Sequence, residues 1–292
     1  MLKFRKSNLL ATLLLALSLS TAGVLAQDLE TFADTSRLVS IGGSLTEIVF
    51  ALGEEKRLVA RDQTALFPEA ALALPDVGYM RQLAPEGVLS VSPTALLVLE
   101  GSGPPEALEV LSHAGVDYQT VPESYSAEGV VTKVRAVGQA LGVSDKAETL
   151  AAELETEFAS LQEHNAAITE PKRVLFILSN QGGQIQASGT GTAADGIITL
   201  AGAANAITEY PGYKALSEEA ITEAAPDVIV MMDRGGDHGA SDAELLAHPA
   251  VALTPAGQNK AIYRLDGAYL LGFGPRTAAA ATELSGLIYG EH

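Results

Sequence analysis

Residues 144–168 read SDKAETLAAELETEFASLQEHNAAI, and their apolar side chains recur every three or four positions. This spacing is typical of a helix with one buried face. The residues of that face would be Ala147, Leu150, Ala151, Leu154, Phe158 and Leu161. A helix from Asp145 to about Ile168 would be roughly 36 Å long at 1.5 Å per residue, and Pro171 would end it. A helix of this length at mid-chain is suited to linking two lobes.

Short apolar strands alternate with helical segments on both sides of this helix. The expected strands are Arg37–Ile41, Leu58–Ala60, Ala95–Leu99 and Tyr118–Val121 before it, and Arg173–Ser179, Asp227–Met232 and Ala261–Leu265 after it. Alternation of this kind favours parallel sheets. We therefore predict an α/β fold of two Rossmann-like lobes, 27–143 and 171–292, joined by a linking helix at 144–170, with a ligand cleft between the lobes.

The first predicted strand runs directly into a helix. Ser44 is a candidate N-cap, and Glu47 stands three residues later, where a capping box places its acidic member. The run Gly42-Gly43-Ser44 could instead hold an anion on free N–H groups. It lacks the spacing of a dinucleotide or Walker A loop, which favours an ordinary tight turn.

The second half of the chain repeats the first. Ser92-Pro93 and the apolar run after it resemble Ala225-Pro226 and its apolar run. Arg37-Leu38-Val39 resembles Arg173-Val174-Leu175 in the same way, and nearly the same length of chain separates the members of each pair. Chance remains an alternative because α/β proteins often place apolar strands after proline. Two related lobes explain both resemblances together.

Residues 1–26 have the pattern of a secretory signal peptide: Lys3, Arg5 and Lys6, then an apolar run, then small residues up to Ala26. Cleavage after Ala26 would leave residues 27–292 as the mature chain. A membrane anchor is the alternative, but the apolar run is interrupted by polar residues and is shorter than the roughly 20 residues that span a bilayer.

Charge and cysteine content narrow the function. Loss of the leader lowers the basic count from 18 to 15 against 36 acidic residues, so the formal charge changes from −18 to −21. Nucleic-acid binding is therefore not expected. The sequence contains no cysteine, which removes disulfides, thiolate sites and lipidation at the signal junction. We expect a soluble, periplasmic monomer without a lipid anchor.

Hydrolase and metal-site patterns fit poorly. No Gly-x-Ser-x-Gly motif occurs, and the five histidines do not pair with a serine. His113 and His164 stand near helix ends, where surface positions are usual. His238 lies in the loop Asp233–His238 after a predicted strand, so a secreted enzyme using this loop remains a distant alternative, although a solvated loop explains the residues equally. No set of converging metal ligands is visible.

The segment Asp76-Val77-Gly78-Tyr79-Met80-Arg81 carries a tyrosine beside a flexible glycine, with an arginine two residues further on. A phenolate is an anionic oxygen donor, and tyrosine is a known ligand of haem iron. A guanidinium nearby would favour the phenolate. The alternative is a loop tyrosine that packs over the edge of the sheet.

At these residues the chain resembles the haemin-binding periplasmic proteins of bacterial ABC importers. These belong to the helical-backbone substrate-binding family, which also contains vitamin B12 and siderophore binders. Three stretches carry the resemblance: Ile41–Gly53, Val77–Arg81 and Leu271–Thr277. The resemblance implies a receptor that captures ferric haem, delivers it to an inner-membrane permease and catalyses no reaction. A siderophore or corrinoid binder is the alternative.

The resemblance also implies roles for single residues. Tyr79 would be the axial ligand of the haem iron, and Arg81 its electrostatic partner. Tyr213 corresponds to an aromatic residue that lines the cleft from the second lobe. Lys214 and Arg234, with Arg81, are the candidate cations for the haem propionates. Some relatives add a histidine from the second lobe, whereas the corresponding stretch here, Ser179–Gly183, has none, which argues against six-coordinate or two-haem binding.

In the same family, one glutamate on each lobe docks onto arginines of the permease, in the helix before a proline-led strand. Glu86 stands seven residues before Pro93, and Glu219 stands seven before Pro226. We therefore expect Glu86 and Glu219 to be the docking residues, although a solvated surface role is the ordinary alternative for any one glutamate.

Overall fold

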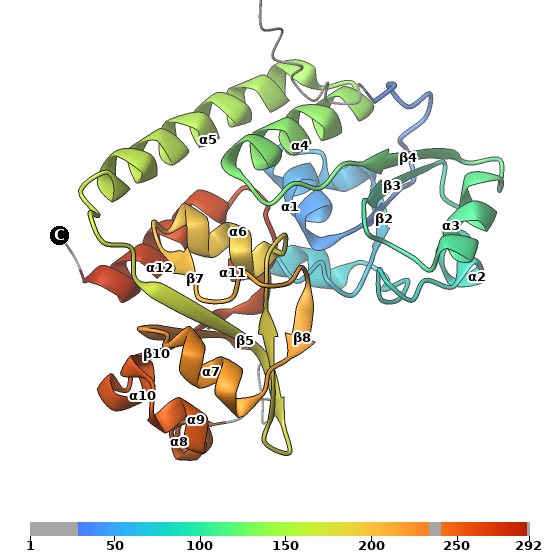
Figure 1. Ribbon diagram of the computed structural model, residues 1–292. Helices are drawn as coiled ribbons and strands as arrows, with labels where there is room; N and C mark the ends of the chain where they lie inside the picture. The colour runs from blue at the N-terminus through green and yellow to red at the C-terminus, as the bar shows by residue number, and fades with distance from the viewer. Residues whose placement is uncertain (1–28, 234–240, 291–292) are drawn as a thin grey trace, which may run out of the picture.

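The computed structural model describes residues 29–233 and 241–290. The predicted signal peptide therefore lies outside the described residues, as do Arg234 and His238. Within the described ranges, no helix combines the length and the apolar character needed to cross a membrane. Two lobes lie below one long helix, which runs along the top of the molecule in Figure 1.

The amino-terminal lobe is built on a four-stranded parallel sheet in the order β2-β1-β3-β4. Its strands are β1 (Leu38–Ile41), β2 (Leu58–Arg61), β3 (Ala95–Leu99) and β4 (Asp117–Val121). Its helices are α1 (Gly43–Ala51), α2 (Pro85–Leu89), α3 (Pro105–Ser112) and α4 (Ala127–Ala140), with short 3₁₀ turns at Glu55–Arg57 and Glu69–Ala73. All four strands were expected at these positions, within one residue at their ends.

The carboxy-terminal lobe contains a six-stranded sheet, in which β10-β9-β5-β6-β8 are neighbours and β7 pairs with β5. Its strands are β5 (Arg173–Gln181), β6 (Gln184–Ser188), β7 (Ala204–Asn205), β8 (Tyr213–Ala215), β9 (Val228–Asp233) and β10 (Ile262–Asp266). Its helices are α6 (Ala193–Leu200), α7 (Glu218–Ala224), α8 (Asp242–Ala247), α9 (Pro249–Ala252), α10 (Pro255–Asn259), α11 (Gly267–Leu271) and α12 (Thr277–Tyr289).

This second sheet is mixed, whereas the sequence predicted parallel strands. β7, β5, β9 and β10 are parallel, but β6 runs antiparallel to β5, and β8 runs antiparallel to β6. Gly182 and Gly183 make the tight turn between β5 and β6, with φ values of 60° and 84°. Two consecutive positive φ angles are the geometry of a hairpin turn that glycine adopts without strain.

The linking helix is α5 (Ser144–Asn165), which ends five residues before the predicted boundary. Asn165 ends the helix and ties it to the carboxy-terminal lobe. Its Nδ2 donates to the Leu200 carbonyl at 2.8 Å, and its Oδ1 accepts from Ser285 Oγ at 3.1 Å. All the predicted face residues except Leu150 are buried, and Leu150 is half-buried. Helix α12 packs against α5, so the hydrophobic core runs continuously from one lobe into the other.

Helix α1 begins at the glycine pair. Gly42 is the N-cap with a φ of 117°, and its N–H donates to Asp62 Oδ1 at 2.9 Å. The Gly43 N–H donates to Thr64 Oγ1 at 2.8 Å, and a Cβ at Gly43 would lie only 2.4 Å from the Thr64 carbonyl oxygen. These two N–H groups are therefore bonded to side chains of the chain itself, which leaves them unavailable to an anion.

The capping box predicted for Ser44 and Glu47 is wrong. Ser44 lies inside the helix and is buried, so its side chain cannot act as the N-cap. Glu47 bonds instead to Arg276, whose Nε and Nη2 donate to its carboxylate at 3.1 and 2.9 Å. The local sequence matched a capping box, but the Glu47 carboxylate pairs with Arg276, a residue 229 positions away.

The internal repeat reappears in the structure. Leu38 pairs with Ala95 in the first sheet, and Val174 pairs with Val228 in the second, so the repeated stretches occupy equivalent strands. The residues before the two prolines, Ser92 and Ala225, both have positive φ angles, 50° and 39°. Because positive φ is uncommon outside glycine, this agreement supports the interpretation of two related lobes.

Candidate functional site

Tyr79 is half-buried in the loop between β2 and α2. Gly78 precedes it with a φ of 105°, and the Gly78 N–H donates to Asp76 Oδ1 at 2.8 Å, which fixes the turn. Arg81 Nη1 donates to the Tyr79 hydroxyl oxygen at 2.9 Å, and its guanidinium carbon lies 5.9 Å from the ring centroid. The structure therefore brings together the tyrosine and arginine that the sequence singled out.

Tyr213 lies on the other lobe, at the start of β8. Burial raises the pKa of its phenol, while Thr192, the Ala194 N–H and the Arg81 guanidinium oppose that shift. Arg81 belongs to the amino-terminal lobe, so this electrostatic interaction acts between the two lobes. Two of the predicted ligand-binding residues, one from each lobe, therefore interact electrostatically.

The two tyrosines occupy equivalent places in the repeat. Tyr213 follows Gly212, whose φ is 77°, as Tyr79 follows Gly78. The distance along the chain between the two Gly-Tyr pairs is almost the same as that between Pro93 and Pro226. The pseudo-repeat therefore supplies one tyrosine from each lobe to the same region.

Sequence reasoning missed Tyr125, a third tyrosine in this region. Burial is the main cause that raises the pKa of its phenol, and Glu123 acts in the same direction. Arg81 and Tyr213 also interact with it electrostatically. We refer to Tyr79, Arg81, Tyr125 and Tyr213 as the tyrosine cluster. Its position in the sequence could have identified it, because Tyr125 follows the carboxyl end of β4, and open α/β sheets bind ligands at the carboxyl ends of their strands.

Lys214 does not join this cluster. Neighbouring residues of a strand point to opposite faces of the sheet, so Lys214 points away from the face of Tyr213. Its ammonium lies 4.9 Å from the ring centroid of Tyr210. Arg234, the other proposed cation, lies outside the described residues.

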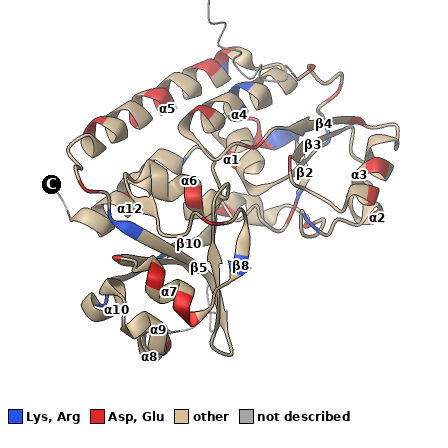
Figure 2. Cartoon of the chain, in the orientation of Figure 1, with Lys and Arg blue, Asp and Glu red and all other residues tan. Residues whose placement is uncertain are grey.

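The two predicted docking glutamates occupy matching positions. Glu86 is the second residue of α2, and Glu219 is the second residue of α7. Both side chains are exposed. Figure 2 shows acidic residues on α3, α5 and α7, with few basic residues near them.

Equivalent arginines hold the ends of these two helices. Arg37 Nε donates to the Ser92 carbonyl at 2.8 Å, just after α2, and Arg173 Nε donates to the Ala224 carbonyl at 2.9 Å, at the end of α7. Arg37 and Arg173 are also the first residues of the two repeated stretches. Each lobe therefore presents its glutamate on a helix fixed in the same way.

A family model described as "Periplasmic binding protein" matches residues 38–269. The chain belongs to the periplasmic binding protein family. It is 40% identical to BhuT, described as a periplasmic haem-binding protein in complex with two haems, with a TM-score of 0.82 over 86% of this chain and 97% of BhuT. It is 39% identical to the apo form of the periplasmic haem-binding protein RhuT from Roseiflexus sp. RS-1, with a TM-score of 0.83 over 88% and 98%.

Two curated relatives are more distant. The Bacillus subtilis protein YvrC, named an uncharacterized ABC transporter substrate-binding lipoprotein, is 26% identical over 266 residues, 90% of this chain and 83% of YvrC. A vitamin B12-binding protein of Photorhabdus laumondii is 24% identical over 224 residues, 75% and 78% of the two chains.

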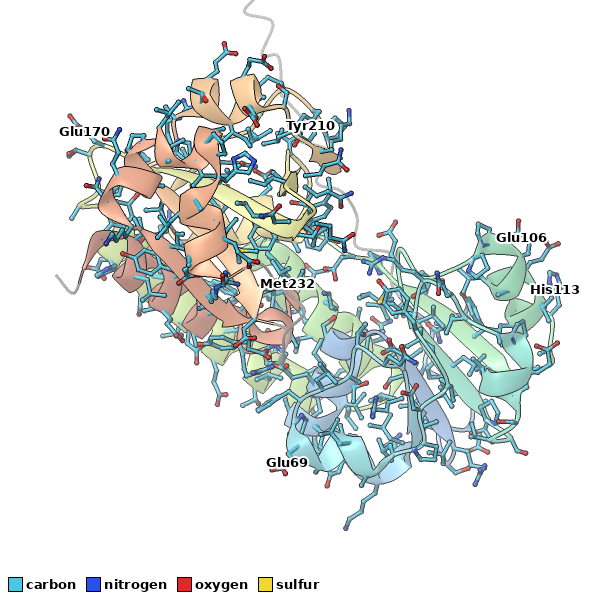
Figure 3. All side chains as sticks on the ribbon, turned by 90° about the horizontal axis from the view of Figure 1, so that it is seen from below. Glu69, Glu106, His113, Glu170, Tyr210 and Met232 are labelled. Carbon is cyan, nitrogen blue, oxygen red and sulfur yellow. The ribbon has the colours of Figure 1, made fainter. Side chains whose placement is uncertain are left out.

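The family is one of substrate-binding proteins, which argues against the secreted-enzyme alternative. In its loop, Asp233 is described but His238 is not. Across 29–233 and 241–290, no three histidine or carboxylate side chains come together as a metal site would require. His113 is exposed at the end of α3 and bonds to the Glu109 carbonyl of its own helix, at the far end of the amino-terminal lobe in Figure 3.

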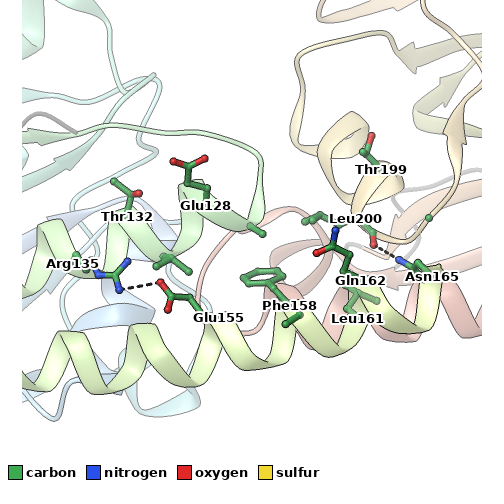
Figure 4. Close-up of a pocket in the computed structure, with 14 residues that line it drawn as sticks. Glu128, Thr132, Arg135, Glu155, Phe158, Leu161, Gln162, Asn165, Thr199 and Leu200 are labelled. Carbon is green, nitrogen blue, oxygen red and sulfur yellow. Dashed lines mark hydrogen bonds and ion pairs between the residues drawn. The ribbon is translucent and has the colours of Figure 1, made fainter. Parts of the chain in front are cut away.

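A cavity of about 680 Å³ lies between α4, α5 and α6 (Figure 4). Phe158 and Leu161 contribute apolar surface to it, and Arg135 and Glu155 form an ion pair of 3.0 Å at one side. No residue of the tyrosine cluster lines this cavity. The cavity is therefore separate from the candidate ligand site.

Proposed function

We propose that this periplasmic binding protein captures ferric haem at the tyrosine cluster, with Tyr79 as the ligand of the iron. One observation carries the proposal: the Tyr79 hydroxyl accepts a hydrogen bond of 2.9 Å from Arg81, whose charge also acts on Tyr213 of the other lobe. Tyrosine is a known ligand of haem iron, and the hydrogen bond from Arg81 orients the Tyr79 oxygen. BhuT and RhuT, which share about two fifths of their residues with this chain, are both named haem-binding proteins.

The surroundings of Tyr79 suit a large, flat, partly apolar ligand. The loop that carries Leu66 and Phe67 runs beside the Tyr79 loop, because the Gln63 N–H donates to the Gly78 carbonyl at 2.9 Å. Leu66 is 53% exposed and Phe67 is 42% exposed, although both are strongly apolar. Exposed apolar side chains next to polar groups often mark binding surfaces. Leu66 and the part of Phe67 that is not covered by Arg276, whose guanidinium carbon lies 3.6 Å from the ring centroid, offer contact surface for a porphyrin ring.

The charge balance assigns Arg81 a second role. The chain has a formal net charge of −18, and haem carries two propionates, so the ligand needs local cations. Arg81 is exposed beside the phenol that would bind the iron. We propose that Arg81 supports the iron ligand and also reduces the repulsion between the ligand and the protein, whereas Lys214 contributes to neither.

A corrinoid or siderophore is the second candidate ligand. The relationship to a vitamin B12-binding protein favours a corrinoid. The two candidates differ in what they ask of Tyr79, because ferric haem has an axial position that a phenolate can fill, whereas both axial positions of the cobalt in cyanocobalamin are already occupied. Cyanocobalamin is therefore the appropriate competing probe.

We further propose that Glu86 and Glu219 dock the loaded receptor onto an inner-membrane permease. Their equivalent positions on α2 and α7 support this proposal, because a two-fold permease would present the same basic group to each lobe. The monomeric state, the soluble form and the absence of a lipid anchor stay predictions, since the relative YvrC is named a lipoprotein. Mass spectrometry and sedimentation of the exported protein would test all three.

Titration with haemin tests the proposed ligand. The wild-type protein should give a saturable change in the Soret band, and Tyr79→Ala should abolish the spectrum of the tyrosine-bound iron and weaken binding at least about tenfold. Tyr118→Phe, a half-buried tyrosine on β4, is the matched control and should behave as wild type. Saturable binding of cyanocobalamin without binding of haemin would instead support the corrinoid alternative.

A further inference from the structure

Tyr125 stands where the two lobes meet. It lies in the short link between β4 and α4, and helix α6 of the other lobe packs directly against it at Gly196. A Cβ built on Gly196 would lie 2.4 Å from the Tyr125 carbonyl oxygen and 2.9 Å from Cζ of Phe273. This approach is too close for any residue except glycine, so the link, α6 and Phe273 form one tightly packed junction.

The Tyr125 ring is held in a defined orientation at this junction. Its centroid lies 5.1 Å from that of Phe273 with an interplanar angle of 67°, which is an edge-to-face contact. Phe273 is 1% exposed and belongs to the segment between α11 and α12. The Tyr125 ring therefore rests against a buried ring that has little freedom to move.

A buried lysine, Lys133, holds the main chain of Phe273. Lys133 Nζ donates to the Phe273 carbonyl at 3.0 Å and to Glu123 Oε2 at 2.7 Å, and it lies 3.3 Å from Ser44 Oγ. The Lys133 side chain has no exposed surface, and that of Glu123 is 9% exposed. A buried charge of this kind is costly to move without its partners, so Phe273 and the Tyr125 ring against it are firmly placed.

The hydroxyl of Tyr125 remains available to a ligand. Among the described residues, none forms a hydrogen bond with it, although the ring is half-buried. Burial and the nearby carboxylate of Glu123 raise the pKa of the phenol, so the hydroxyl keeps its proton at neutral pH. A protonated phenol is a hydrogen-bond donor. The charge of Arg81 also acts on this phenol and favours an anionic acceptor there.

We propose that Tyr125 is a further ligand-binding residue, whose hydroxyl donates a hydrogen bond to a carboxylate of the ligand. The inference rests on the haem-binding function proposed above, in which the acceptor is a propionate. The two tyrosines then bind different parts of the haem. Tyr79 coordinates the iron, and Tyr125 together with Arg81 binds the propionates. Phe273 and Lys133 are positioning residues for Tyr125.

Titration with haemin and with its dimethyl ester distinguishes a hydrogen bond from Tyr125 to the propionate from a packing effect of the Tyr125 ring. The wild-type, Tyr125→Phe and Tyr118→Phe proteins are each titrated with both compounds, and affinity and Soret position are recorded. Tyr125→Phe keeps the ring and its contact with Phe273 but removes the donor. It should bind haemin about tenfold more weakly, as expected for loss of a hydrogen bond to a charged group. The Soret position should match wild type, because Tyr79 is unchanged.

With the dimethyl ester, which lacks the carboxylates, the difference between Tyr125→Phe and wild type should shrink to about twofold or less. The control Tyr118→Phe should match wild type with both compounds. Wild-type affinity of Tyr125→Phe for haemin would overturn the inference, as would an equal loss of affinity for haemin and the ester. Absence of haemin binding by the wild-type protein would instead overturn the proposed function itself, so the two failures are distinguishable.

Discussion

Glu54 connects two helices through a single carboxylate. Lys146 Nζ donates to its Oε1 and Arg57 Nε donates to its Oε2, both at 2.6 Å. Lys146 also donates to the Leu52 carbonyl at 3.2 Å, so the end of α1 is tied to the start of α5. The hydrogen bond from Lys146 is the largest cause that lowers the pKa of Glu54 below its usual 4.5, and Arg57 adds to it.

This lowered pKa predicts how stability depends on pH. A carboxyl whose pKa is lower in the folded state stabilises the protein above its unfolded pKa, and the contribution is lost as the pH falls through the folded value. Wild type should be more stable than Glu54→Gln by up to about 1 kcal/mol at pH 7, and the difference should shrink as the pH falls below 4.5 and through the lowered pKa of the folded state. Urea unfolding from pH 7 to 3.5 measures it. Glu163→Gln, on exposed α5 surface, is the control; a difference that did not change with pH would contradict the assignment.

At the residue scale, the sequence predicted contacts between residues that are close along the chain. Tyr79 and Arg81 are two positions apart, and their hydrogen bond follows from that spacing and the turn at Gly78. Lys214 lies against Tyr210 and outside the tyrosine cluster, because its neighbour Tyr213 is in a strand, where adjacent side chains point to opposite faces. Tyr125 was missed because its importance depends on α6 and Phe273, which are distant in sequence.

At the element scale, α4 and α5 pack against each other at a glycine. A Cβ built on Gly138 of α4 would lie 2.1 Å from Cβ of Ala147 in α5. Neither atom is at the end of a flexible side chain, so an added methyl group must separate the helices. In α12, a Cβ on Gly286 would meet nothing within 4 Å. The two helical glycines are thus a matched pair that differs in packing.

We predict opposite effects of alanine at these two positions. Gly138→Ala should lower the free energy of unfolding by about 1–3 kcal/mol because the contact is overpacked. Gly286→Ala should raise it by about 0.5–1 kcal/mol because alanine restricts the unfolded chain and favours the helix. Urea unfolding of both variants provides the measurement. Equal stability of Gly138→Ala and wild type would show that the helices can separate without cost.

Elements with strong periodicity were predicted well, and those defined by tertiary pairing were not. The buried parallel strands and α5 follow from apolar runs and helical spacing within single segments. The β6 and β8 strands were missed because their segments are short and polar and become strands by pairing with β5 and with each other. The capping box at Ser44 failed because Asp62, Thr64 and Arg276 supply the bonds from elsewhere.

At the scale of the whole molecule, the sequence showed the internal repeat. It did not show that the chain passes back to the amino-terminal lobe near its carboxyl end. After its second sheet the chain passes back to the first lobe, where the Phe273 carbonyl accepts from Lys133 and Arg276 pairs with Glu47. Helix α12 then packs along α5. The two lobes are therefore held by α5 and by this returning segment, whose long-range contacts leave no periodic signal in the sequence.

The paired glutamates give a prediction for the complete receptor. If the two lobes present Glu86 and Glu219 to equivalent basic groups of a permease, reversal of both charges places like charges opposite each other at two points. Glu86→Arg combined with Glu219→Arg should therefore abolish haem-dependent growth or uptake, and each single variant should reduce it in part. The haemin affinity of the purified double variant should equal that of wild type, because neither residue belongs to the tyrosine cluster.

The control reverses the same amount of charge elsewhere on the surface. Glu106 follows Pro105 at the start of α3, as Glu86 follows Pro85 at the start of α2, and it is exposed as well. Glu106→Arg combined with Glu163→Arg matches the double variant in net charge, and it should support normal uptake. Loss of uptake in this control would assign the effect to overall charge, and weakened haemin binding in the Glu86/Glu219 variant would assign it to the receptor's own structure. Loss of uptake confined to the Glu86/Glu219 variant, with intact haemin binding, requires a partner that contacts both lobes.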